Sequence, residues 1–196
     1  MKCIITTEGF GDMVFTLFPE HAPITTANFV KTARDGFYDG LAWCRIVEGY
    51  VIQGGSPDND IMTDSDWHIK GEFEENGIPN PVKHVRGAIS MARDDAPDTA
   101  GTQFFVVHQD APKLDGRYAA FGQMTEGFDV LDKIASVPTY GPETWNKPVE
   151  MPVISRIQIL ESIVMKAYKV QCEYCGEWFE AGNDYRNHVM AAHSNN

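Results

Sequence analysis

Apolar and polar residues alternate in several short stretches of this chain, a pattern typical of β-strands. The first two stretches, 3–7 and 13–18, are joined by a glycine-containing turn at 8–12. Further strand-like stretches lie at 87–91, 103–107, 119–121 and 153–160. Many short strands separated by turns predict a β-barrel or a β-sandwich.

Two stretches instead carry apolar residues at helical spacing, 25–34 and 128–136, and predict amphipathic helices. The first has Thr25 or Thr26 available as N-cap and Gly36 as its stop. Helices with one apolar face are expected to pack on the surface of a sheet.

Residues 43–55 read as a strand, a turn and a second strand, and they place Arg45 among apolar residues. A guanidinium stays charged in proteins, so burying one without a partner is costly. Gln53, after the second apolar run, offers amide donors and an acceptor to the same neighbourhood. The pair predicts the floor of a binding site, and the alternative is an Arg45 that only pairs with a carboxylate.

The stretch 56–66 is acidic and rich in turn-forming residues, which predicts an exposed loop. The histidines at 21, 68, 84 and 108 have no second ligand at metal spacing. They are therefore interpreted as surface or core-edge residues.

The composition is typical of a globular protein with a hydrophobic core, and acidic residues outnumber basic ones. Of the 196 residues, 43% are hydrophobic and 11% aromatic, and the formal net charge is -12. Phosphates and anionic lipids bind basic faces, so this charge argues against a nucleic-acid or membrane-surface binder. The chain carries no signal-peptide pattern and no apolar run of membrane-spanning length. We expect a cytoplasmic protein with Cys3 and Cys44 as buried, reduced thiols.

Four separated motifs resemble the cyclophilin family of peptidyl-prolyl cis-trans isomerases in order and spacing. They are Trp43 to Gly55, Ser90 to Arg93, Gly101 to Phe105 and Leu114 to Gly122. The resemblance covers roughly residues 1–160. It implies a mainly β fold, a closed eight-stranded antiparallel β-barrel capped by two α-helices.

The resemblance implies catalysis of rotation about X-Pro bonds in protein substrates, assisting folding, with no cofactor. It assigns the catalytic role to Arg45, supported by Gln53. Substrate binding is implied for a set of residues around them: Tyr50, Val51, Ala92, Arg93, Gln103, Phe105, Lys113, Leu114 and Tyr118. The alternative is a binding module for proline-containing polypeptides in which turnover is incidental.

The chain departs from the common family pattern at several groove positions. Tyr50 and Val51 stand where Phe and Met are usual, so the proline pocket stays apolar but is reshaped. Tyr118 replaces the His of many eukaryotic members and resembles the bacterial type. Lys113 stands where eukaryotic members carry a Trp that contacts cyclosporin.

The far end of the chain contains Cys172, Cys175, His188 and His193 at the spacing of a Cys2His2 zinc finger. A segment of this length buries too little apolar surface to fold unaided, so a structural Zn²⁺ is expected. The alternatives are a Cys172–Cys175 disulfide or a finger that has lost its metal. The predicted organisation is an isomerase domain at 1–160, a linker at 161–169 and a ββα zinc-finger-like module at 170–196.

Acidic side chains dominate the predicted finger, among them Glu173, Glu177, Glu180 and Asp184. DNA phosphates would repel such a surface, which argues against DNA recognition by this module. A protein partner or a purely structural role is expected for this module.

Overall fold

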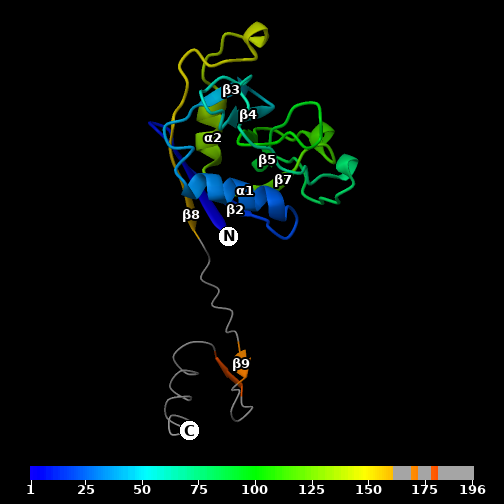
Figure 1. Ribbon diagram of the computed structural model, residues 1–196. Helices are drawn as coiled ribbons and strands as arrows, with labels where there is room; N and C mark the ends of the chain where they lie inside the picture. Colours follow the sequence, from blue (N-terminus) through cyan, green and yellow to red (C-terminus); the bar gives the residue numbers. More distant parts are fainter. Residues whose placement is uncertain (161–168, 172–177, 181–196) are drawn as a thin grey trace. The chain divides into compact units, whose positions relative to one another are not determined.

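The computed structural model of the protein describes residues 1–160, 169–171 and 178–180 (Figure 1). The chain divides into two compact units, Met1–Glu161 and Ser162–Asn196. The predicted zinc ligands Cys172, Cys175, His188 and His193 lie outside the described residues.

The first unit is built on one sheet of eight strands in the order β3-β4-β6-β5-β7-β2-β1-β8, with every neighbouring pair antiparallel. Along the first two strands, every second side chain is buried in the core, as the sequence pattern predicted. The strands are β1 (Lys2–Thr7), β2 (Gly11–Leu17), β3 (Trp43–Val47), β4 (Val51–Gly54), β5 (Ala88–Met91), β6 (Phe104–Val107), β7 (Ala120–Glu126) and β8 (Ile154–Leu160).

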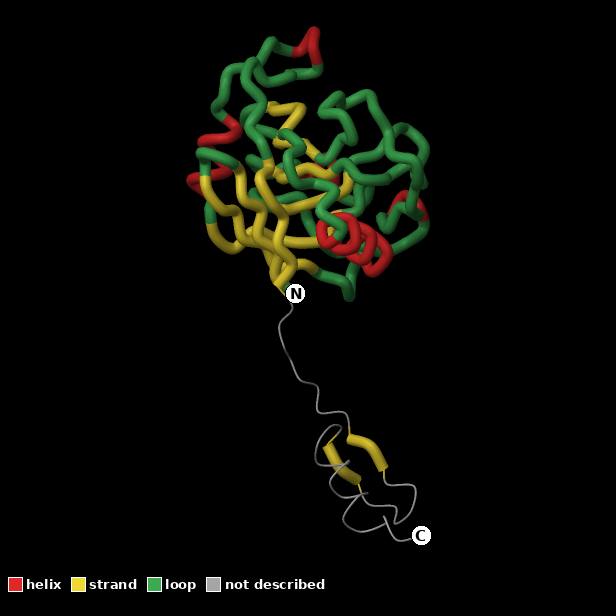
Figure 2. Tube along the Cα trace, turned by 60° about the vertical axis from the view of Figure 1, so that its left-hand side comes forward, coloured by secondary structure: helices red, strands yellow, loops and turns green. Residues whose placement is uncertain are grey.

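The two ends of this sheet, β3 and β8, meet at a single isolated bridge between Ala42 and Val153. Two backbone hydrogen bonds flank it, from Trp43 N to Pro152 O at 2.9 Å and from Ile154 N to Leu41 O at 2.7 Å. The eight antiparallel strands are confirmed, and among the described residues they form a half-barrel joined at this bridge instead of a barrel closed by a full ladder. Figure 2 shows the strands gathered on one side and the long loops on the other.

Two helices, α1 (Pro23–Arg34) and α2 (Phe128–Ala135), pack on the sheet as predicted. The short 3-10 turns are η1 (Glu74–Asn76), η2 (Pro112–Leu114) and η3 (Pro142–Thr144).

The predicted cap of the first helix is wrong. No side chain of the helix caps its start. The Glu72 carboxylate, 47 positions from Thr25, instead accepts the backbone N–H groups of Ile24 at 3.0 Å and Thr25 at 2.7 Å. A charged acceptor at the positive end of the helix dipole explains why a local cap is dispensable.

The main core lies between the sheet and α1 and centres on packed aromatic rings. Phe104 contacts Phe29, Tyr38 and Trp43 with ring centroids 5.3 to 5.5 Å apart. Cys3 and Cys44 are buried free thiols, as predicted. Burial raises the pKa of Cys44 to about 11, so this thiol stays protonated.

The second unit contains the antiparallel strands β9 (Lys169–Gln171) and β10 (Trp178–Glu180). Their register places Trp178 opposite Gln171 and Glu180 opposite Lys169. Neither helix described by the structure is long and apolar enough to span a bilayer.

Candidate active site

A groove of about 880 Å³ opens beside β3 and β4. It is lined by nearly all of the residues that the sequence assigned to catalysis and substrate binding: Arg45, Tyr50, Val51, Gln53, Ala92, Arg93, Gln103, Phe105, Leu114 and Tyr118. The hairpin at 43–55 and the motifs at 90–93, 101–105 and 114–122 therefore converge on one surface.

Strand register brings the polar side chains of the groove together. Arg45 on β3 lies opposite Gln53 on β4, and its Nη1 donates to Gln53 Oε1 at 3.1 Å. Gln53 Nε2 then donates to Gln103 Oε1 at 2.9 Å. Gln103 Nε2 in turn donates to the carbonyl oxygens of Ile61 and Thr63 at 3.1 and 3.0 Å. This chain of hydrogen bonds fixes the amide orientations and holds the guanidinium in place.

Arg45 is partly buried, and its Nε is a buried donor with no partner among the described residues. Burial lowers the pKa of the guanidinium, with Tyr50 and Tyr118 opposing the shift. Proteins rarely leave a buried donor unpaired, because its lost hydration is uncompensated. The half-buried guanidinium as a whole lines the groove, where it can meet a bound molecule.

An apolar surface adjoins Arg45. Val51, Phe105 and Leu114 are buried there, and Tyr50, Ala92 and Tyr118 pack against them while staying partly exposed. The Tyr118 ring meets Phe105 edge-on with centroids 5.7 Å apart. Burial, together with Tyr118, raises the pKa of Tyr50, so Tyr50 presents a neutral hydroxyl at the rim. The pocket suits a small apolar ring beside a hydrogen-bond donor.

The Arg93 side chain is held among backbone carbonyls and aromatic rings. Its guanidinium donates to the carbonyl oxygens of Arg117, Asp94 and Asp95 at 2.7 to 3.0 Å. It also lies 4.7 Å from the Tyr118 ring centroid and 4.9 Å from that of Phe73. These contacts fix the rim of the groove and leave the backbone of Ala92 and Arg93 to face a ligand.

The family profile described as cyclophilin type peptidyl-prolyl cis-trans isomerase matches residues 2–159. The chain belongs to this family. It is 45% identical over 122 residues to peptidyl-prolyl cis-trans isomerase B of Bacillus subtilis, a match covering 62% of this chain and 82% of that protein. A Helicobacter pylori peptidyl-prolyl cis-trans isomerase is 44% identical over 126 residues, which cover 63% of this chain and 74% of that protein.

A solved cyclophilin-type isomerase of Cryptosporidium parvum superposes with a TM-score of 0.73 at 29% identity, covering 82% of this chain and 99% of that chain. Some relatives are much longer. The chain spans 37% of the length of a Streptococcus pyogenes protein named as a bifunctional phosphatase/peptidyl-prolyl cis-trans isomerase. The predicted function, a cyclophilin-type peptidyl-prolyl cis-trans isomerase, and the predicted enzyme class are confirmed.

One predicted binding residue of this cyclophilin lies apart from the others. Lys113 is exposed on η2 and does not line the groove, although its neighbour Leu114 does. Lys113 and Leu114 are the second and third residues of η2, and successive residues of a 3-10 turn point in different directions, so one faces the pocket while the other faces solvent.

Sequence reasoning missed two parts of the groove wall. The acidic loop predicted to be merely exposed contributes Ile61, Met62, Thr63 and Asp64, tied to the groove by Gln103. Trp145 lines the groove from a loop far along the chain. Both contributions are long-range contacts without a local pattern.

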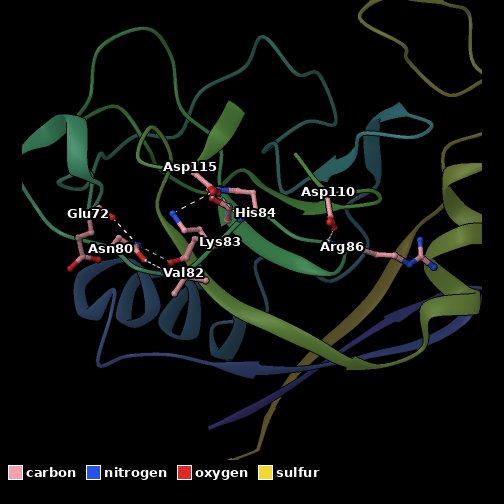
Figure 3. A network of polar contacts seen from close by, with 10 residues as sticks. Glu72, Asn80, Val82, Lys83, His84, Arg86, Asp110 and Asp115 are labelled. Carbon is pink, nitrogen blue, oxygen red and sulfur yellow. Dashed lines mark hydrogen bonds and ion pairs between the residues drawn. The ribbon is translucent and has the colours of Figure 1, made fainter. Parts of the chain in front are cut away.

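His84 is more buried than the predicted surface or core-edge position, because its side chain is fully buried. Its Nδ1 lies 3.1 Å from Asp115 Oδ1 (Figure 3). Its Nε2 lies 3.0 Å from Ser90 Oγ. The ring stacks on Phe105 with centroids 5.9 Å apart. Burial lowers the pKa of His84, outweighing the opposing effect of Asp115. A neutral imidazole thus packs behind Phe105 in the apolar part of the groove.

Within the described ranges, no group of three or more His, Cys, Asp or Glu side chains is placed to hold a metal ion. The predicted Cys2His2 set lies outside those ranges and is taken up below.

Proposed function

We propose that Arg45 is the catalytic donor of this isomerase and that its clients are exposed X-Pro bonds of folding proteins. The observation that carries this proposal is the half-buried Arg45 guanidinium that lines the groove beside the apolar pocket. Rotation about the peptide bond has a barrier of about 18–20 kcal/mol that arises from amide resonance. A donor aimed at the prolyl nitrogen stabilises the twisted state, in which that nitrogen is pyramidal, more than the planar ground state.

The other groove residues bind and orient the peptide in this proposal. Gln53 and Gln103 offer amide groups to the peptide backbone, and the backbone of Ala92 and Arg93 pairs with its amides and carbonyls. The proline ring enters between Val51, Phe105 and Leu114, with Tyr50 and Tyr118 at the rim and Lys113 outside. The Cryptosporidium parvum relative was crystallised in the presence of the dipeptide Ala-Pro, which supports proline-containing peptides as substrates.

The test replaces Arg45 by Ala and by Lys and follows isomerisation of a short Ala-Pro peptide. We expect turnover to fall more than about tenfold in Arg45→Ala, with a melting temperature changed by only a few degrees, because the side chain acts on the transition state. Arg45→Lys should also be poor, since an ammonium lacks the planar fork of donors.

The matched control for this test is Arg86→Ala. Arg86 is likewise a half-buried arginine, paired with Asp132 and lying over the Phe128 ring, but it does not line the groove. Its loss should leave turnover per folded molecule unchanged. Near-normal turnover in Arg45→Ala would contradict the catalytic assignment, and peptide binding by the wild-type chain without turnover would favour a binding module.

We further propose that the chain comprises an isomerase domain at 1–160, a linker at 161–169 and a Cys2His2 module at 170–196 with a structural Zn²⁺. The β9–β10 pairing supports the module, because Cys172 and Cys175 fall between two paired strands. Two thiolates and two imidazoles form a closed tetrahedral ligand set suited to zinc. The module's acidic composition favours a protein partner over nucleic acid, and the free thiols of Cys3 and Cys44 fit a reducing cytoplasm.

Metal analysis of the full chain tests the module. We expect about one zinc per chain, and we expect chelation or Cys175→Ser to release it while isomerase turnover on a short peptide stays the same. A zinc-free preparation from metal-replete cells would contradict the site. A parallel loss of zinc and turnover would contradict the independence of the two domains.

A further inference from the structure

The first compact unit contains three tryptophans, and Trp145 differs from the other two. Trp43 is fully buried and its Nε1 donates to Thr7 Oγ1 at 3.1 Å. Trp67 is 43% exposed, and its Nε1 donates to Asn28 Oδ1 at 2.9 Å. Trp145 is 58% exposed, and its indole makes no hydrogen bond or ring contact with any described residue. Its apolar ring and its N–H donor are therefore open to a bound molecule.

The backbone at Trp145 is in a conformation that bulky residues avoid. Its φ is 58°, and Asn146 follows with a φ of 57°. The left-handed region is uncommon for side chains other than glycine and asparagine, and for a bulky aromatic it is a strained position. Strain of this kind persists only where surrounding contacts impose it, and it concentrates at ligand-binding sites.

The surrounding loop supplies these contacts. Tyr140 N donates to Lys147 O and Asn146 N to Gly141 O, each at 2.9 Å, and residues 139 and 148 form an isolated bridge. The loop is therefore a closed, internally bonded unit. Figure 1 shows it in yellow, with the turn η3, projecting beyond β3.

One hydrogen bond anchors this loop beside the catalytic strand. Ile46 N donates to Asn146 O at 3.0 Å, so the residues following Arg45 and Trp145 in sequence are directly bonded. Trp145 lines the same groove as Arg45 and the proline pocket. The Trp145 backbone is thus fixed at the edge of the groove, next to the assigned donor, and carries an exposed indole.

We propose that Trp145 forms a subsite for an aromatic or large apolar side chain adjacent to the substrate proline. The inference rests on the function proposed for the Arg45 groove and specifies its substrate preference. An indole on a fixed backbone offers a large contact area to such a side chain and has only two side-chain torsions to order on binding. Peptides with a small residue at both flanks of the proline make no use of this ring.

The experiment measures kcat/KM for proline peptides carrying either Ala or Phe immediately before the proline, and either Ala or Phe immediately after it. The starting chain should prefer Phe over Ala at one of these positions. Trp145→Gly should lower kcat/KM for that Phe peptide roughly three- to tenfold more than kcat/KM for the Ala peptide, mainly through KM. Trp145→Phe should retain most of the preference.

Melting temperatures separate binding from a structural role. Glycine adopts a φ of 58° without strain, so Trp145→Gly should melt no lower than the starting chain. Tyr140→Ala is the matched control, because Tyr140 is equally exposed on the same loop but does not line the groove. It should keep the Phe preference.

Three outcomes would overturn the subsite: no Phe preference at either position, a preference that survives Trp145→Gly, or equal losses on Ala and Phe peptides with a lowered melting temperature. Failure of the underlying proposal looks different. In that case Arg45→Ala would turn over the Ala peptide normally, whatever happens at Trp145.

Discussion

Phe104 and Phe105 are neighbours on β6, yet they serve opposite sides of the sheet. Phe104 points into the main core and contacts the rings of Phe29, Tyr38 and Trp43. Phe105 points toward the groove and contacts His84 and Tyr118. The alternation of side chains along a strand produces this division. One strand therefore contributes both to the stability of the fold and to the binding surface.

Buried polar atoms without a described partner are not confined to the groove. Trp43 and Tyr38 in the main core donate to Thr7 Oγ1 and to the Thr102 carbonyl. The hydroxyls of Thr25, Thr26 and Thr102, however, are buried without a partner among the described residues, as Arg45 Nε is. What distinguishes the groove side is therefore its open apolar pocket beside a guanidinium.

Phe104→Ala should give the largest stability effect. Removing a fully buried ring among three aromatic neighbours leaves a cavity and should lower the free energy of unfolding by about 3–5 kcal/mol. Turnover per folded molecule should change little. Denaturant unfolding and an activity assay at low temperature measure both. A large fall in kcat/KM at full folding would show that the core and the groove are not separable.

Phe105→Ala should reverse this balance. We expect KM for a proline peptide to rise several-fold, because the ring forms a wall of the apolar pocket. The stability loss should be smaller than for Phe104→Ala, since the groove admits water into the space left behind. Phe105→Leu, which keeps the site apolar, should recover part of the affinity. An unchanged KM would remove Phe105 from the pocket wall.

His84→Gln should give a smaller effect, visible in the pH dependence of stability. Because the folded-state pKa of His84 is lowered from 6.5 by burial, the unfolded chain binds the proton more readily, and stability falls as pH drops through that value. Melting temperatures between about pH 7 and pH 5 should therefore decline less steeply in the variant.

The Asp115 carboxyl acts in a different pH window. Burial would raise its pKa, but hydrogen bonds from His84 outweigh that effect and lower it from 3.8, so its contribution is lost only at stronger acidity. An equally steep decline in His84→Gln between about pH 7 and pH 5 would contradict the role of His84.

Local patterns were enough to predict the elements and the centre of the groove. Alternation identified the strands, and the strand-turn-strand reading of residues 43–55 anticipated that Arg45 lies opposite Gln53. Two residues flanking a tight turn have few ways to pair, so their proximity is a local property. The start of α1 was mispredicted for the converse reason, because Glu72 reaches it from 47 positions away.

The sequence by itself determined the strand-like stretches, the two helices and the closeness of Arg45 and Gln53, because hydrophobic periodicity and short-range register act within a few residues. The other groove residues were predicted from the resemblance to the cyclophilin family. Only the tertiary structure decided that the sheet ends meet at Ala42 and Val153, that His84 is buried behind Phe105 and that Trp145 lies at the groove. Each of these depends on contacts between segments far apart in the chain. Their free energy comes from packing and desolvation across the fold, which no local pattern encodes.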